Sequence, residues 1–176
     1  MSMNHPVLLY KSDDAMYSQI INFLSKGIDH HERCVFLTTK PDGDKIFQEL
    51  KNLKDQSDVV KLFSYFSLPD PVFHTEEFSA KTSKIFKKFF NENFVGRIAF
   101  RVLGDMSRHT PESVSKVEEA EKYLHSISGN KRKFLCTLEI GEDNESSKKM
   151  KQIALGNHDH ILYENNDGNF SKTKLN

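Results

Sequence analysis

The residues best suited to chemistry in this sequence lie in the segment 97–108, which reads RIAFRVLGDMSR. Residues 98–103 form an apolar run typical of a buried strand, yet this run contains the charged Arg101. Gly104 breaks the run, and Asp105 follows directly. Ligands of open α/β sheets bind beyond the carboxyl ends of the strands. This arginine and this carboxylate therefore indicate a binding site, in which the guanidinium would donate paired hydrogen bonds to a small anionic ligand.

Two further polar residues lie where the sequence predicts the interior. Tyr10 ends the first apolar run, and Glu121 shares the inner face of a predicted helix with Val117 and Leu124. A buried charge is costly unless it is paired. Arg101 and Glu121 would meet this requirement by pairing with each other. Alternatively, both line a pocket and hold a small polar ligand, and the sequence leaves the two interpretations open.

Histidines provide a weaker signal for a metal site. His158 and His160 would point to one side of an extended segment, and His5, just before the first predicted strand, would be a third ligand. No cysteine or glutamate at an established metal-binding spacing accompanies them. The sequence therefore predicts neither a metal nor a cofactor. It contains no G-x-S-x-G motif either, and we predict no catalytic residue.

The turn after the first predicted strand disfavours nucleotide binding. A phosphate-binding loop needs glycines, so that backbone amides approach the phosphates, and a lysine for charge. Residues 11–14 read KSDD, with no glycine and two carboxylates that would repel a triphosphate. No Walker A motif and no G-x-G-x-x-G motif occur elsewhere.

The composition limits the class of protein further. With 176 residues, the chain has the size of one domain and can bury a core without disulfides. Its 25 basic and 25 acidic residues balance, which argues against a general binder of nucleic acid or anionic membranes. Cys34 and Cys136 lie in apolar runs and are predicted to be buried free thiols; a redox pair would require neighbouring strands. No signal peptide or membrane-spanning run is visible, so we expect a cytoplasmic protein.

Strands and helices are predicted to alternate along the chain. Apolar runs of strand length lie at residues 5–10, 34–38, 59–65, 98–103, 134–140 and 161–163. Helical spacing of apolar residues lies between them, at 16–27, 46–53, 76–93, 114–127 and 144–155, with Gly27 as a predicted helix stop. Continuous apolar strands are typical of sheets covered on both faces. We predict one three-layer α/β domain over residues 1–164, with a mostly parallel central sheet, and a frayed polar tail over residues 165–176.

Several short motifs, in this order and spacing, resemble the MEDS domain, the sensory domain of DcmR-type regulators of methanogens and methylotrophs. They are HPVLLY at 5–10, GI at 27–28, ERCVF at 32–36, RVLGDMS at 101–107, EKYL at 121–124, FLC at 134–136 and His158. The resemblance implies a RecA/KaiC-like fold that lacks the phosphate-binding loop. It likens segment 101–105 to the strand whose terminal acid helps to hold magnesium in those ATPases. The family often has glutamate at the position of Asp105 and an aromatic residue near Ser107.

The resemblance also implies a role in sensing small molecules, including hydrocarbon derivatives, coupled to an output domain. We therefore predict a non-enzymatic small-molecule sensory domain that acts in signal transduction through a regulatory partner protein. The predicted ligand contacts are His5, Tyr10, Arg101, Asp105, Glu121 and His158. Two alternatives stay open: an enzyme that uses Asp105, Glu121 and His158 in the same pocket, and an adaptor or homodimerisation protein with a vestigial nucleotide site. We predict no direct contact with nucleic acid or membrane.

Overall fold

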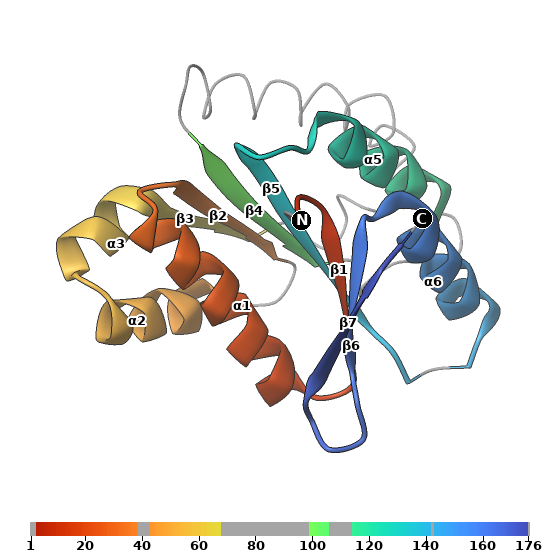
Figure 1. Cartoon of the computed structure of the whole chain (residues 1–176). Helices are drawn as coiled ribbons and strands as arrows, with labels where there is room; N and C mark the ends of the chain where they lie inside the picture. Colours follow the sequence, from red (N-terminus) through yellow and green to blue (C-terminus); the bar gives the residue numbers. More distant parts are fainter. Residues whose placement is uncertain (1–2, 39–42, 68–98, 106–113, 142, 176) are drawn as a thin grey trace.

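One seven-stranded sheet forms the centre of the fold (Figure 1). The computed structural model describes residues 3–38, 43–67, 99–105, 114–141 and 143–175, and of residues 38, 66, 67, 105, 115 and 116 it describes the backbone alone. The strand order is β3-β2-β4-β5-β1-β6-β7. The strands are β1 (Pro6–Tyr10), β2 (Arg33–Thr38), β3 (Phe63–Ser67), β4 (Phe100–Asp105), β5 (Arg132–Glu139), β6 (His160–Glu164) and β7 (Phe170–Lys174). All neighbouring strands are parallel except β6 and β7.

Helices cover both faces of this sheet, as the sequence predicts (Figure 1). The described helices are α1 (Asp13–Asp29), α2 (Gly43–Leu53), α3 (Gln56–Leu62), α5 (Val114–Ile127) and α6 (Glu145–Asn157). Helices α1, α2 and α3 pack in one core cluster, and α5 and α6 pack in the other. The predicted three-layer α/β class with a mostly parallel sheet is confirmed.

Alternation along the strands assigns each side chain to one of the two cores. In β1, Val7 and Leu9 face α5 and α6, whereas Leu8 and Tyr10 face α1. The two cysteines face opposite cores, because Cys34 lies in the α1 core and Cys136 in the other. Their strands, β2 and β5, are separated by β4. The two thiols are therefore free and do not form a redox pair.

The segment 59–65 differs from its prediction as a single strand. Val59 and Val60 lie in α3, and β3 begins only after that helix ends. The carboxylate of Asp55 accepts hydrogen bonds from the backbone N–H groups of Ser57 (2.9 Å) and Asp58 (3.3 Å) and so caps the helix. A short apolar run does not by itself distinguish a buried strand from a helical turn.

The frayed tail predicted over residues 165–176 is wrong for residues 170–174. These residues form β7, which pairs antiparallel with β6 in a register that joins His160 to Lys174. A turn between the two strands contains Gly168, whose φ of 77° favours glycine. Most side chains of β7 are exposed, so no apolar pattern marks it in the sequence.

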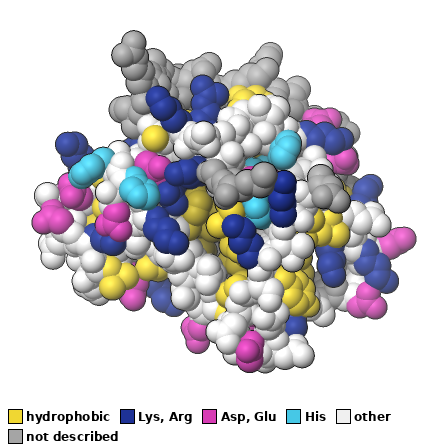
Figure 2. Space-filling view, viewed as in Figure 1, with side chains coloured by type: hydrophobic (Ala, Val, Ile, Leu, Met, Phe, Trp, Pro, Cys, Tyr) yellow, Lys and Arg dark blue, Asp and Glu magenta, His cyan; other side chains and the backbone are white. Residues whose placement is uncertain are grey.

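The predicted helix over residues 76–93 lies outside the described residues. Of the helices that are described, none is both long and apolar enough to cross a membrane. On the face shown in Figure 2, basic and acidic side chains both occur, with apolar surface between them. The surface on this face does not single out one binding region.

Candidate functional site

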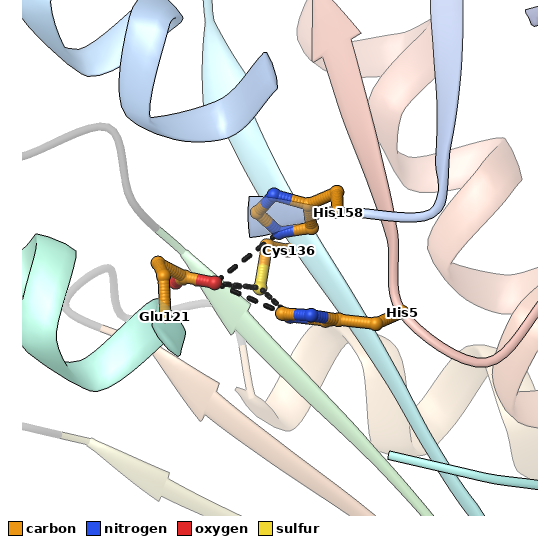
Figure 3. Close-up of side chains that lie close together, drawn as sticks. All are labelled: His5, Glu121, Cys136 and His158. Carbon is orange, nitrogen blue, oxygen red and sulfur yellow. Dashed lines mark hydrogen bonds and ion pairs between the residues drawn. The ribbon is translucent and has the colours of Figure 1, made fainter. Parts of the chain in front are cut away.

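Four side chains that can bind metals or carry protons converge in the core between the sheet and α5 (Figure 3). They are His5, Glu121, Cys136 and His158, and all four are buried. One ligand atom of each lies within 4.8 Å of those of the others. Three of the six predicted ligand contacts thus meet in space, and Cys136, which was not among the six, joins them.

Neighbouring strands bring His5 and Cys136 together. His5 directly precedes β1, and Val7, two residues later, is the register partner of Cys136 in β5. Because side chains alternate along a strand, His5 projects to the same face of the sheet as Val7 and Cys136. The sulfur of Cys136 lies 3.5 Å from Nε2 of His5.

The other two members come from the helical layer and its return to the sheet. Glu121 lies on the inner face of α5, where Val117 and Leu124 flank it at helical spacing. His158 is the residue that ends α6, just before β6. The cluster therefore ties the start of β1, the middle of β5, helix α5 and the end of α6 to one another.

The ring of His158 is held in one tautomer. Its Nδ1 lies 2.8 Å from the carbonyl oxygen of Ala154, which can only accept a hydrogen bond, so Nδ1 carries the proton. In the neutral ring Nε2 then presents a lone pair, which lies 3.2 Å from Oε2 of Glu121 and has no hydrogen-bond partner. Two electron-rich atoms therefore face each other unless a proton or another cation lies between them.

Glu121 is the acceptor at the centre of the cluster. Its Oε2 lies 3.2 Å from Nε2 of His5 and 3.3 Å from the Cys136 sulfur, whose S–H donates to it. Burial opposes ionisation of Glu121, but the contacts with His158 and His5 outweigh it and hold the pKa of this carboxyl well below its usual range. Burial lowers the pKa of His5, which favours a neutral ring.

The thiol of Cys136 is not an activated nucleophile in this arrangement. Burial, and then the neighbouring Glu121 carboxylate, raise the pKa of the Cys136 thiol well above its usual value. A catalytic cysteine needs the opposite shift and access to a substrate. The burial and raised pKa of this thiol therefore disfavour nucleophilic catalysis by Cys136.

Arg101 pairs with Glu32, and the predicted pairing with Glu121 is wrong. Nε of Arg101 donates to Oε2 of Glu32, and Nζ of Lys133 lies 2.9 Å from Oε1 of the same carboxylate. Burial opposes ionisation of Glu32, but hydrogen bonds from Arg101 and Lys133 outweigh it and lower its pKa. The reason for the error is the face of the sheet: Arg101 projects toward α1, where its NH1 group donates to the carbonyl of Phe23, whereas Glu121 lies across the sheet.

Tyr10 and His160 do not join the cluster either. Tyr10 is buried in the α1 core, on the same side of the sheet as the Arg101 side chain. Asp105 ends β4, where its backbone pairs with Thr137, but its side chain lies outside the described residues. His160, which was considered a metal ligand with His158, instead places Nδ1 3.1 Å from Oδ1 of Asp159.

Comparison with protein families matches residues 4–142 to MEDS, described as the "MEthanogen/methylotroph, DcmR Sensory domain". The match covers most of the chain and includes His5, Glu121 and Cys136, whereas His158 follows it. The chain belongs to the MEDS family. The resemblance drawn from its motifs is confirmed. No curated protein matches the sequence significantly.

In this MEDS domain a carboxylate occupies the N-terminus of α1, the position that phosphate takes in nucleotide-binding α/β proteins. Glu164, at the end of β6, accepts hydrogen bonds from the backbone N–H groups of Lys11 (2.6 Å) and Ser12 (3.0 Å) and from the Ser12 hydroxyl (2.9 Å). These donors are therefore engaged within the protein, and a phosphate at this position would meet a negative charge.

Sequence reasoning missed two members of the MEDS domain's polar interior. Cys136 lies on the same face of β5 as Phe134 and Leu138, two residues to either side, and the apolar pattern predicts this face. Only the strand order reveals that His5 lies beside it. Glu32 lies in a polar turn and carried no sign of burial. The alternation of β4 could have separated Arg101 from Glu121, because its neighbours Phe100 and Val102 face the α5 core.

Proposed function

We propose that this MEDS domain is a non-enzymatic sensory domain that binds a small ligand and signals through a partner protein. In this proposal the buried cluster of His5, Glu121, Cys136 and His158 is the sensing centre. Membership of a sensory family supports the general role. The observation that carries the assignment of the centre is the convergence of four ligating side chains in a core that is otherwise apolar.

The position of the cluster provides a route from ligand to output. Its members belong to four parts of the fold, so a change in their mutual distances shifts α5 and the end of α6 against the sheet. A ligand changes the balance of two conformations only if it binds them unequally. The cluster meets this condition. Two of its buried ring nitrogens, Nδ1 of His5 and Nε2 of His158, lack hydrogen-bond partners, so a ligand that binds there alters the hydrogen bonds within the cluster.

The alternative of an enzyme receives less support. An enzyme in the predicted pocket would use Glu121 as a base, but the lowered pKa of that carboxyl makes it a weak base. The raised pKa of Cys136 disfavours a thiolate nucleophile. We further propose a cytoplasmic location, with which two cysteines that form no disulfide are compatible.

A thermal-shift screen with nucleotides, divalent metal ions and small organic acids tests the proposal, since any compound that binds only the folded state raises the melting temperature. We expect stabilising compounds to lose their effect in His158→Gln and to keep it in His30→Gln, an exposed histidine at the end of α1. Hydrogen exchange with the same compounds should slow in α5 and at the end of α6. Stabilisation that persists in His158→Gln, or exchange that changes only elsewhere, would contradict the proposed centre.

A further inference from the structure

We propose that the cluster of His5, Glu121, Cys136 and His158 is a binding site for one divalent transition-metal ion of the zinc type. This inference rests on the proposed function for its biological role, but its chemical basis is independent. Imidazole nitrogens and a thiolate, with a carboxylate, are the ligands that zinc takes in proteins. Four ligands from one chain would complete a tetrahedral site without an open position, as in sites that do not catalyse hydrolysis.

Four of the six distances between the ligand atoms fit such a site, and the other two are no longer than 4.8 Å. With the usual zinc–ligand bond lengths, neighbouring ligand atoms in a tetrahedral site lie about 3.3–3.6 Å apart. Oε2 of Glu121 lies 3.2 Å from each Nε2 of His5 and His158. The sulfur of Cys136 lies 3.5 Å from Nε2 of His5 and 3.3 Å from that carboxylate oxygen. Figure 3 shows the four side chains directed toward one another.

The hydrogen-bonding state of the cluster also indicates a cation. His158 donates its Nδ1 proton to the carbonyl of Ala154, which is the arrangement that orients metal-binding histidines. The lone pair on Nε2 is thereby directed at the Glu121 carboxylate, 3.2 Å away, without a hydrogen bond. A metal ion between these atoms would take the place of a proton and bind both of them.

The charges balance when the ion is divalent. The carboxylate of Glu121 and the thiolate of Cys136 would contribute two negative charges, and the two imidazoles are neutral ligands. A divalent ion makes the buried site neutral, which avoids the cost of burying a net charge. On binding, the thiol of Cys136 gives up its proton to solvent, so affinity rises with pH.

The test uses the whole chain, reduced and freed of metal by a chelator, and titrated with Co²⁺ and then Zn²⁺. We expect uptake of one equivalent, visible d–d bands of tetrahedral cobalt, and a near-ultraviolet band from thiolate-to-cobalt charge transfer. Zn²⁺ should then displace Co²⁺ and abolish these bands. Absence of uptake by the folded protein, or cobalt spectra without the charge-transfer band, would overturn the proposal.

Matched variants assign the ligands. Cys136→Ser and His158→Gln should weaken Zn²⁺ binding by more than about 100-fold, beyond the loss that removal of an outer hydrogen-bond partner produces. Cys34→Ser, which alters the thiol in the opposite core, and His30→Gln should bind as the wild type does. Equal weakening in Cys34→Ser and Cys136→Ser would overturn the assignment. If Cys136→Ser does not fold, the wild-type charge-transfer band decides, because it requires a sulfur ligand.

The outcome also separates the metal site from the sensing role. Metal binding without any change of hydrogen exchange in α5 or α6 supports the site and contradicts its role as a sensing centre. Stabilisation by an organic acid that depends on His158, with no uptake of Zn²⁺ or Co²⁺, overturns the metal site and supports the sensing centre.

Discussion

Arg101 and Glu32 form a buried ion pair that fastens the turn between α1 and β2 to β4. Lys133 of β5 contacts the second oxygen of Glu32, and the guanidinium of Arg101 lies over the ring of Phe23, 5.1 Å from its centre. Through Glu32, Arg101 thus connects β4 with β5 and with the turn between α1 and β2, which are distant in the sequence. Its partners among the described residues lie within the protein, which supports a structural role for the pair.

Double-mutant cycles test this pair through the free energy of unfolding in urea. We expect Arg101→Met and Glu32→Gln each to lower it by about 3–5 kcal/mol, because each leaves a buried charge without its partner. Glu32→Gln should cost more, since it leaves both Arg101 and Lys133 without a carboxylate. The double variant should cost less than the sum of the two.

The control cycle combines Arg101→Met with Glu121→Gln, whose side chains lie on opposite faces of the sheet. Distant residues without shared partners contribute additively, within about 0.3–0.5 kcal/mol. Additivity for Arg101 and Glu32, or strong coupling of Arg101 to Glu121, would contradict the described pairing.

Gly27 makes the same region sensitive to a single methyl group. It lies inside α1 and does not end the helix as predicted; a Cβ at this position would clash with the sulfur of Cys34 and come within 2.8 Å of Cδ of Arg101. We expect Gly27→Ala to destabilise the protein by about 1–3 kcal/mol through overpacking, despite the better helix propensity of alanine. Thermal unfolding measures the change.

Gly156, in the last turn of α6, is the matched control for Gly27. A Cβ at Gly156 would meet no atom within 4 Å. We expect Gly156→Ala to stabilise by roughly 0.5–1 kcal/mol, because alanine loses less backbone entropy on folding. The same sign of change at both glycines would show that packing against Cys34 and Arg101 is not the cause.

Local pattern was sufficient to predict most of the fold. The continuous apolar runs of β1, β2 and β5 follow from a sheet that is covered on both faces, and helical spacing located α1, α5 and α6. Pattern failed at Val59, where a capped helix precedes the strand, and at β7, which is stabilised by backbone pairing with β6 and has few apolar side chains. Both failures occur where backbone hydrogen bonds, which an apolar pattern does not report, determine the local structure.

The site was predictable only in part, for a different reason. His5, Glu121 and His158 could be named because each lies next to or within an apolar pattern. Their grouping depends on strand order, which alternation within one strand does not contain. The pairing of β1 with β5 brings Cys136 beside His5, and no local pattern in the sequence specifies it.

Acid should destabilise the protein through Glu121. The pKa of this carboxyl in the folded state lies below its ordinary value of 4.5, so the unfolded chain binds its proton first. The resulting stability is fully present above pH 4.5 and is lost as pH falls through the lower, folded-state pKa. His5, whose pKa is also lowered from 6.5, adds a loss of the same sign that begins at higher pH. Urea unfolding between about pH 7 and pH 3 measures both effects.

Glu121→Gln should flatten the acid limb of this profile, and Glu118→Gln is its control. Glu118 lies one turn earlier in α5 and pairs with Lys122 at the surface, so its removal should leave the profile nearly unchanged. A profile of Glu121→Gln that keeps the wild-type slope below pH 4.5 would mean that this carboxyl is not held ionised by the two histidines.

Glu164 should be essential for the start of α1. Glu164→Ala removes the acceptor for the Lys11 and Ser12 backbone amides and for the Ser12 hydroxyl, and leaves these donors partly buried without a partner. We expect the free energy of unfolding to fall by about 1–3 kcal/mol, and hydrogen exchange to accelerate in the first turn of α1. Asp167→Ala, in the turn between β6 and β7, removes a carboxylate whose hydrogen bonds in the described part of the chain go to Asn169 of the same turn, and should leave exchange in α1 unchanged. If both variants accelerate exchange in α1 equally, loss of the β6–β7 hairpin, rather than of the Glu164 cap, would be the cause.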